Sequence, residues 1–137
     1  MSSTTYIVDV VGELFAIEIE PEVQDWLEAL PAKYFLEIDE YVGLLAEQAE
    51  SLSEPYARYL GDGVRELRPT LGGAAIRITY WIAPGRRVIL LTVFRKTRMR
   101  EDAEVKSAKL TQQTCQAEHE PAHREFIRTI EKGELDR

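Results

Sequence analysis

The spacing of apolar residues in the first part of the chain predicts extended segments followed by two helices. The extended segments cover residues 6–11 and 14–20, and the second alternates apolar and polar positions as a half-buried strand does. Pro21 begins the first helix, at a position where a missing N–H costs nothing, and Pro31 ends it. The second helix covers residues 32–51, because its apolar residues recur at spacings of three or four.

The middle of the chain is strand-like. Pro55 and the glycine-rich residues 61–63 predict a loop. Three strands are then expected, over residues 64–68, 74–83 and 87–95. The last two are joined by Pro84-Gly85-Arg86, which is typical of a hairpin turn. Residues 88–94 are almost wholly apolar, so this strand is expected to be central and covered on both faces.

The last part of the chain is predicted to be helical. A third helix covers residues 101–118, Pro121 interrupts it, and residues 123–132 form a short last helix that Gly133 ends. The order of elements indicates an α+β fold, in which a small antiparallel-rich sheet, a meander, packs against two N-terminal helices and a C-terminal helix. A length of 137 residues favours a single domain.

Composition narrows the class of protein. Hydrophobic residues make up 45% and charged residues 30%, as in ordinary globular proteins. The single cysteine, Cys115, excludes an internal disulfide and is expected to be a partly buried helix residue. No apolar run approaches the roughly 18 residues of a membrane span, and the N-terminus lacks the basic region of a secretory signal. We therefore expect a cytoplasmic protein without membrane association.

Charge is segregated along the chain. Residues 1–62 contain 14 acidic and 2 basic residues, whereas residues 63–109 contain 11 basic and 4 acidic residues. The net charge of −7 hides this division. Because the basic block coincides with the predicted strands, an acidic protein can present a cationic face that holds a polyanion such as RNA.

The cationic side chains fall at particular places on these strands. Arg65 and Arg68 are three residues apart on the first strand of the block, and Arg77 and Tyr80 are three apart on the next, so each pair points to opposite faces. A further group lies where the apolar strand ends: Arg95, Lys96, Arg98 and Arg100. If the three strands form a meander, these groups converge on one rim of the sheet.

Such a rim has the groups that RNA cleavage by an adjacent 2′-hydroxyl needs. Arg and Lys stabilise the dianionic phosphorane, while a Lys or Tyr can accept or donate the protons. Tyr80 could also stack on an unpaired base. This chemistry requires no metal or cofactor, and Pro121 between His119 and His123 argues against a metal site there. The alternative interpretation is a solvated face that pairs with the acidic helices.

Several segments together resemble one protein family. Residues 60–68, LGDGVRELR, resemble the LGDGLWELR signature of the RelE/HigB superfamily of bacterial type II toxins, in its phage-derived host-inhibition, RelE/ParE-like branch. Residues 76–80 are similar to its R-hydrophobic-x-Y strand, and residues 89–97 to its LLHGFKKT strand end. Residues 15–30 are similar to its opening strand and P-E-V-x-x-W-L-x-x-L helix. The matched segments span a core of about residues 14–115, which leaves residues 116–137 as a C-terminal helical extension.

The resemblance implies a metal-independent mRNA endoribonuclease, an mRNA interferase that inhibits growth, acts on the translating ribosome and is held inactive by a cognate antitoxin. Carried over by position, the catalytic residues are Arg68, Arg77, Tyr80 and Lys96, and the RNA-binding residues are Arg65, Arg95, Arg98 and Arg100. Two departures stand out: Arg95 replaces the first of the family's paired lysines, and no proline follows Thr97.

Two other functions stay open from the sequence. A toxin of the same fold could block a protein target such as gyrase, which requires no convergent set of cations. A non-catalytic relative could retain only antitoxin binding, which would account for the acidic helices and for the departures near Lys96.

Overall fold

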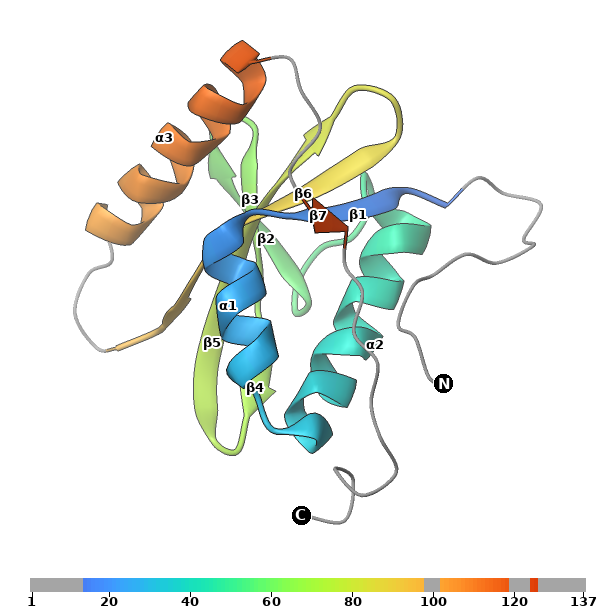
Figure 1. Cartoon of the computed structure of the whole chain (residues 1–137), viewed down its shortest axis with the longest axis vertical. Coiled ribbons are helices and arrows are strands. Elements are labelled where there is room, and N and C mark those ends of the chain that lie inside the picture. The colour runs from blue at the N-terminus through green and yellow to red at the C-terminus, as the bar shows by residue number, and fades with distance from the viewer. Residues whose placement is uncertain (1–13, 98–101, 119–123, 126–137) are drawn as a thin grey trace.

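The structure is a computed structural model, and it describes residues 14–97, 102–118 and 124–125. Within these residues the helices are α1 (Pro21–Ala29), α2 (Ala32–Gln48) and α3 (Asp102–Glu118). The strands are β1 (Ala16–Ile19), β2 (Ala57–Gly61), β3 (Val64–Leu67), β4 (Thr70–Leu71), β5 (Ala74–Ala83), β6 (Arg87–Arg95) and β7 (Arg124–Glu125). Figure 1 shows their arrangement around a single twisted sheet.

The sheet is mixed, with an antiparallel meander at its centre. The strand order is β2-β3-β5-β6-β1-β7, and β4 pairs with the start of β5. β3, β5 and β6 pair antiparallel, as predicted. β1 joins β6 in parallel, with Ile17 opposite Val88. The predicted α+β fold, an antiparallel-rich sheet with two N-terminal helices and a C-terminal helix, is confirmed.

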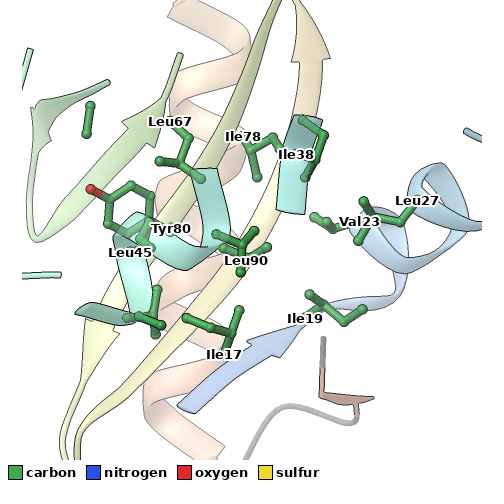
Figure 2. Close-up of a cluster of buried hydrophobic side chains, with 14 of the residues drawn as sticks. Ile17, Ile19, Val23, Leu27, Ile38, Leu45, Leu67, Ile78, Tyr80 and Leu90 are labelled. Atoms are coloured by element: carbon green, nitrogen blue, oxygen red, sulfur yellow. The ribbon is translucent and has the colours of Figure 1, made fainter. Parts of the chain in front are cut away.

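Helices cover both faces of the sheet. α1 and α2 lie on one face, where Ile38 and Leu45 of α2 pack with Ile78 and Leu90 of the central strands (Figure 2). On the other face, Ala108 of α3 belongs to a second apolar cluster. The residues of this cluster are Val64, Ala83, Ile89, Leu91, Ala108 and Cys115. Burial on both faces explains why residues 88–94 are apolar almost throughout.

A β-bulge interrupts β6 beside β5. Thr79 lies opposite Thr92, but the next residue of β5, Tyr80, lies opposite Leu90, so Leu91 is an extra residue. The Thr79 and Thr92 hydroxyls are 2.6 Å apart, and the Thr92 N–H donates to the Thr79 hydroxyl at 3.1 Å. Because one extra residue reverses the alternation of side chains, the bulge decides which face Arg95 occupies at the end of the strand.

Four sequence predictions differ from the structure or lie outside its described part. β2 occupies residues predicted as loop, and β4 was not expected. A helix was predicted over residues 123–132, which is wrong at Arg124–Glu125, since these residues pair with β1 as a strand. The extended segment expected over residues 6–11 lies outside the described residues. In the described part of the chain, no helix has the length and apolar character needed to cross a membrane.

Candidate functional site

Strand pairing brings three of the predicted cations to one end of the sheet. The N–H of Ile76 on β5 donates to the carbonyl of Pro69, which follows Arg68, and Ile76 lies opposite Arg95 of β6. Lys96 follows directly. Since neighbouring strands are about 4.8 Å apart, the backbones of Arg68 and Arg95 are roughly 10 Å apart across this edge. Arg68, Arg95 and Lys96 are termed the basic rim.

Arg95 and Lys96 are the open part of the basic rim. Both side chains are exposed. Neither forms an ion pair with any residue that the structure describes. Arg95 is the last residue of β6 and Lys96 follows it beyond the strand, so both side chains extend from the same edge of the sheet. Both charges are thus available to an anion at this edge.

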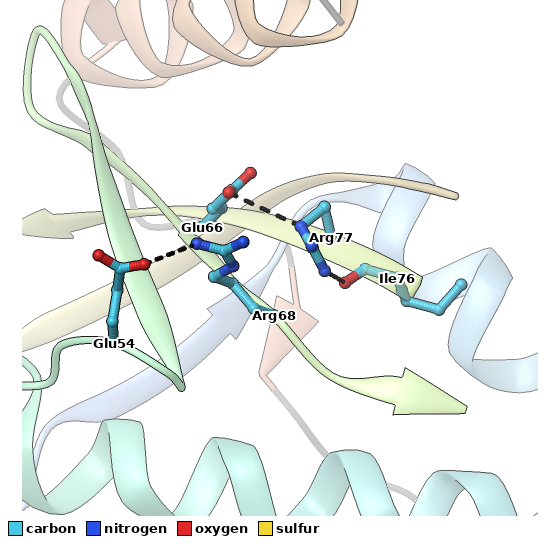
Figure 3. A network of polar contacts seen from close by, with 5 residues as sticks. All are labelled: Glu54, Glu66, Arg68, Ile76 and Arg77. Atoms are coloured by element: carbon cyan, nitrogen blue, oxygen red, sulfur yellow. Dashed lines mark hydrogen bonds and ion pairs between the residues drawn. The ribbon is translucent and has the colours of Figure 1, made fainter. Parts of the chain in front are cut away.

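Arg68 is held by a surface ion pair. Its Nη1 is 3.2 Å from Oε1 of Glu54, whose side chain is 71% exposed, while that of Arg68 is 18% exposed (Figure 3). Exposed pairs of this kind contribute about 0 to 1 kcal/mol because water screens them. A phosphate group can therefore compete with Glu54 for the Arg68 guanidinium.

Arg77 is buried beneath this edge and does not belong to the open surface. Only 7% of it is exposed, its Nη1 donates to the carbonyl of Ile76 at 2.9 Å, and its Nε is 3.7 Å from Oε2 of Glu66 (Figure 3). Glu66 is buried as well. In this conformation Arg77 supports the sheet end with its positive charge and does not reach a bound strand directly.

Tyr80 is fully buried between α2 and the sheet (Figure 2). Its hydroxyl makes no hydrogen bond of good geometry among the described residues, although Arg65 is near enough to act on it electrostatically. Burial raises the pKa of Tyr80 to about 12, and the nearby Arg65 charge offsets part of that rise. The predicted stacking of Tyr80 on a base does not fit a ring with no exposed surface.

Arg65 lies on the face of the sheet that α2 covers. Its guanidinium is 5.7 Å from the centre of the Tyr59 ring, and its Nη1 donates to the carbonyl of Glu50, just after α2, at 3.3 Å. A cation at the carboxyl end of a helix is favourable there. Arg65 therefore lies between the end of α2, the edge strand β2 and the buried Tyr80.

Other predicted residues lie outside the described part of the chain. These are Arg98 and Arg100 of the RNA-binding set and the two histidines, His119 and His123. Among the residues that are described, no group of three His, Cys, Asp or Glu side chains could hold a metal ion. Cys115 lies on α3, as predicted, and is buried in the second apolar cluster, more fully than the partly buried position expected.

The structure also reveals residues that the sequence reasoning missed. Tyr56 and Tyr59 are exposed on the edge of the sheet, and Arg58 between them is exposed too. The available signal was the sequence Tyr-Ala-Arg-Tyr at positions 56–59, which places two aromatic residues and a cation within four positions. It was missed because the proline and glycines on either side predicted a loop.

Comparison with protein families gives one match. The family model described as "Phage derived protein Gp49-like" matches residues 25–126. This range covers α2, the whole meander and α3. No curated protein matches the chain.

Two solved structures are similar to the chain. One is a mutant of the Escherichia coli toxin RelE in the free state, with a TM-score of 0.52 and 13% identity over 72% of this chain and 97% of that chain. The other is the toxin–antitoxin complex RelBE2 from Mycobacterium tuberculosis, with a TM-score of 0.47 and 17% identity over 61% of this chain and 99% of that chain. The first similarity indicates that the chain has a RelE-like fold.

Proposed function

The chain belongs to the Gp49-like family of phage-derived proteins, and from this premise we propose that it is the toxin of a type II toxin–antitoxin system that cleaves mRNA. We place the reaction on the translating ribosome, and therefore in the cytoplasm. The observation that carries the proposal is the basic rim, in which two cations are exposed and unpaired among the described residues and a third is held only by an exposed carboxylate.

The basic rim suits cleavage by attack of a 2′-hydroxyl on the neighbouring phosphate. Arg68 and Arg95 bind the non-bridging oxygens and stabilise the charge that grows on them in the phosphorane. As the new P–O2′ bond forms and the P–O5′ bond breaks, Lys96 donates a proton to the leaving 5′-oxygen and the proton of the 2′-hydroxyl passes to solvent water. The cations themselves supply the charge stabilisation, so the scheme uses no metal.

The two buried residues have indirect roles in this scheme. Tyr80, with a pKa of about 12 and no exposed surface, is unsuited to accept the 2′-hydroxyl proton. Arg77 acts as a positioning residue, since its bond to the Ile76 carbonyl fixes the strand that pairs with Arg95. Together they keep the rim rigid, which favours binding of the transition state.

The partner that fits this surface is an antitoxin with an acidic segment. Such a segment would cover Arg68, Arg95 and Lys96 by charge complementarity and exclude RNA from them. The site is then free only when the antitoxin is removed.

Induced expression in a bacterial host, with 5′-end mapping of mRNA, tests the proposal. We expect growth arrest and new 5′ ends inside translated frames, and we expect Lys96→Ala to abolish both. Arg86→Ala is the matched control, because Arg86 is an exposed cation in the hairpin at the opposite end of β5 and β6, where its guanidinium lies 4.2 Å from the centre of the Phe15 ring. It should cut as the wild type does.

Two other outcomes would contradict the proposal in different ways. Growth arrest with intact mRNA would indicate a toxin that blocks a protein target. Normal growth after strong expression would indicate a non-catalytic relative that only binds its antitoxin.

A further inference from the structure

Two tyrosine rings lie exposed at the edge of the sheet beside the basic rim. Tyr59 of β2 is 59% exposed, and Tyr56, just before β2, is 44% exposed. β2 is the outer strand on this side of the described sheet. A single exposed ring needs no explanation, but two rings that border a cationic edge invite one.

The Tyr59 ring is held in place although most of it is exposed. Its hydroxyl accepts a hydrogen bond from the backbone N–H of Gly63 at 3.0 Å. Arg65 lies opposite it across the two strands, with its guanidinium 5.7 Å from the ring centre. These two contacts fix the ring, so little side-chain entropy remains to be lost when a flat group stacks on it.

Tyr56 connects Tyr59 with the basic rim. The backbone N–H of Arg68 donates to the Tyr56 carbonyl at 2.9 Å, so the two residues lie side by side. The Tyr56 ring packs edge to face against Tyr41 of α2, with ring centres 6.1 Å apart. Tyr56 therefore links β2, which carries Tyr59, to Arg68 of the basic rim.

The charges around the rings favour a polyanion. Arg58 is exposed beside Tyr59, and Arg65 and Arg68 flank the two tyrosines. Nearby carboxylates include Glu54, which pairs with Arg68. Tyr and Arg are also enriched in protein–protein interfaces, but several cations around aromatic rings, beside a cationic edge, are the combination found in grooves that bind single-stranded nucleic acid. The arrangement on β2 is of the second kind.

We propose that Tyr59, assisted by Tyr56, stacks on an unpaired base of the mRNA next to the phosphate held by the basic rim. The proposal rests on the proposed function and extends it from the cleaved phosphate to a neighbouring base. Tyr59 is a binding residue in this account and takes no part in proton transfer.

Single-turnover cleavage of a synthetic mRNA on purified ribosomes, at rising concentrations of the full chain, tests the proposal. Tyr59→Ala is expected to raise the half-saturating concentration roughly 5- to 100-fold, the effect of losing one stacked base, and to leave the maximal rate unchanged. Tyr59→Phe keeps the ring and is expected to stay within a few-fold of the wild type. A second mRNA carries an abasic residue at one position beside the cut, with each position tested in turn.

The abasic mRNA separates stacking from a structural effect. At one position, the wild type should bind the abasic mRNA as weakly as Tyr59→Ala binds the intact one, and the variant should lose nothing further. Equal losses on intact and abasic mRNA at every position would overturn stacking, as would an unchanged half-saturating concentration for Tyr59→Ala. If the wild type cuts no mRNA, the proposed function and the stacking both fail; if it cuts and only the Tyr59 result fails, the proposed function stands.

Discussion

Tyr80 shows how burial changes the chemistry of a single residue. A phenol in a buried position resists ionisation, and the pKa of Tyr80 is raised from 10.0 to about 12. The unfolded chain loses this proton near pH 10, whereas the folded chain keeps it until about pH 12. The stabilising effect is therefore complete below pH 10 and is lost as the pH rises to about 12.

We expect the free energy of unfolding to fall by roughly 2 to 3 kcal/mol over this interval because of Tyr80. The Tyr80→Phe variant has no hydroxyl to ionise at this position, so its free energy of unfolding should fall less steeply above pH 10 than that of the wild type. At neutral pH the substitution should change stability by about 1 kcal/mol or less, since the hydroxyl has no partner of good geometry to lose. Denaturant unfolding of both proteins from pH 7 to pH 12 measures this. If the free energies of unfolding of the two proteins fall in parallel above pH 10, the raised pKa of Tyr80 does not contribute to the loss of stability.

The alternation of residues along β5 predicted which face of the sheet each side chain occupies, but not which faces the helices cover. The sequence placed Arg77 and Tyr80 on opposite faces of β5, and the structure has them so, Arg77 with Glu66 and Tyr80 in the apolar cluster under α2. Both faces of β5 are covered, one by α2 and the other by α3. Alternation cannot reveal such burial, because it depends on helices that pack from distant parts of the sequence.

Among the elements, the bulge in β6 controls the open end of the site. Thr79→Val removes the acceptor of the buried Thr92 N–H as well as the bond between the hydroxyls. The free energy of unfolding should fall by about 1 to 3 kcal/mol, because a buried donor is left without a partner. Thr92→Val removes only the hydroxyl and should cost about 1 kcal/mol.

Urea unfolding of both variants checks this prediction, with Thr79→Ser as the control that keeps the hydroxyl. Cleavage should fall for Thr79→Val beyond what its lower stability explains, because the bulge determines which face Arg95 occupies. Equal stability losses for Thr79→Val and Thr92→Val would show that the Thr92 N–H finds another acceptor.

Local sequence signals explain which elements were predicted. β5 and β6 match the predicted residues 74–83 and 87–95, because an apolar run on each side of a proline–glycine turn is a strong signal. β2 was missed because Arg58 and Tyr59 are both exposed on an edge strand, so its sequence shows no alternation of apolar and polar positions. The pairing of β7 with β1 joins residues about a hundred positions apart, and no local pattern predicts such a contact.

For the molecule as a whole, segregated charge gives an acidic protein a locally cationic edge. β6 carries cations near both of its ends, with Arg86 in the hairpin before it and Arg95 at its last position. Nine residues of strand separate these two ends by roughly 27 to 30 Å, several times the Debye length of about 8 Å at physiological salt. Phosphates at the basic rim therefore respond to the charges at that end of β6 and hardly at all to the charge of Arg86 at the other end.

Salt dependence tests this separation of charge. The affinity for a labelled single-stranded RNA, measured by fluorescence anisotropy from low to high salt, should fall linearly on a double-logarithmic plot, because bound phosphates release counterions. Arg95→Gln should reduce the slope by about 0.7, the value for one phosphate contact of a single strand. Arg86→Gln removes the same charge at the other end of β6 and should leave the slope unchanged. Equal slopes for the two variants would mean that RNA responds to net charge, and the basic rim would then not be where phosphate binds.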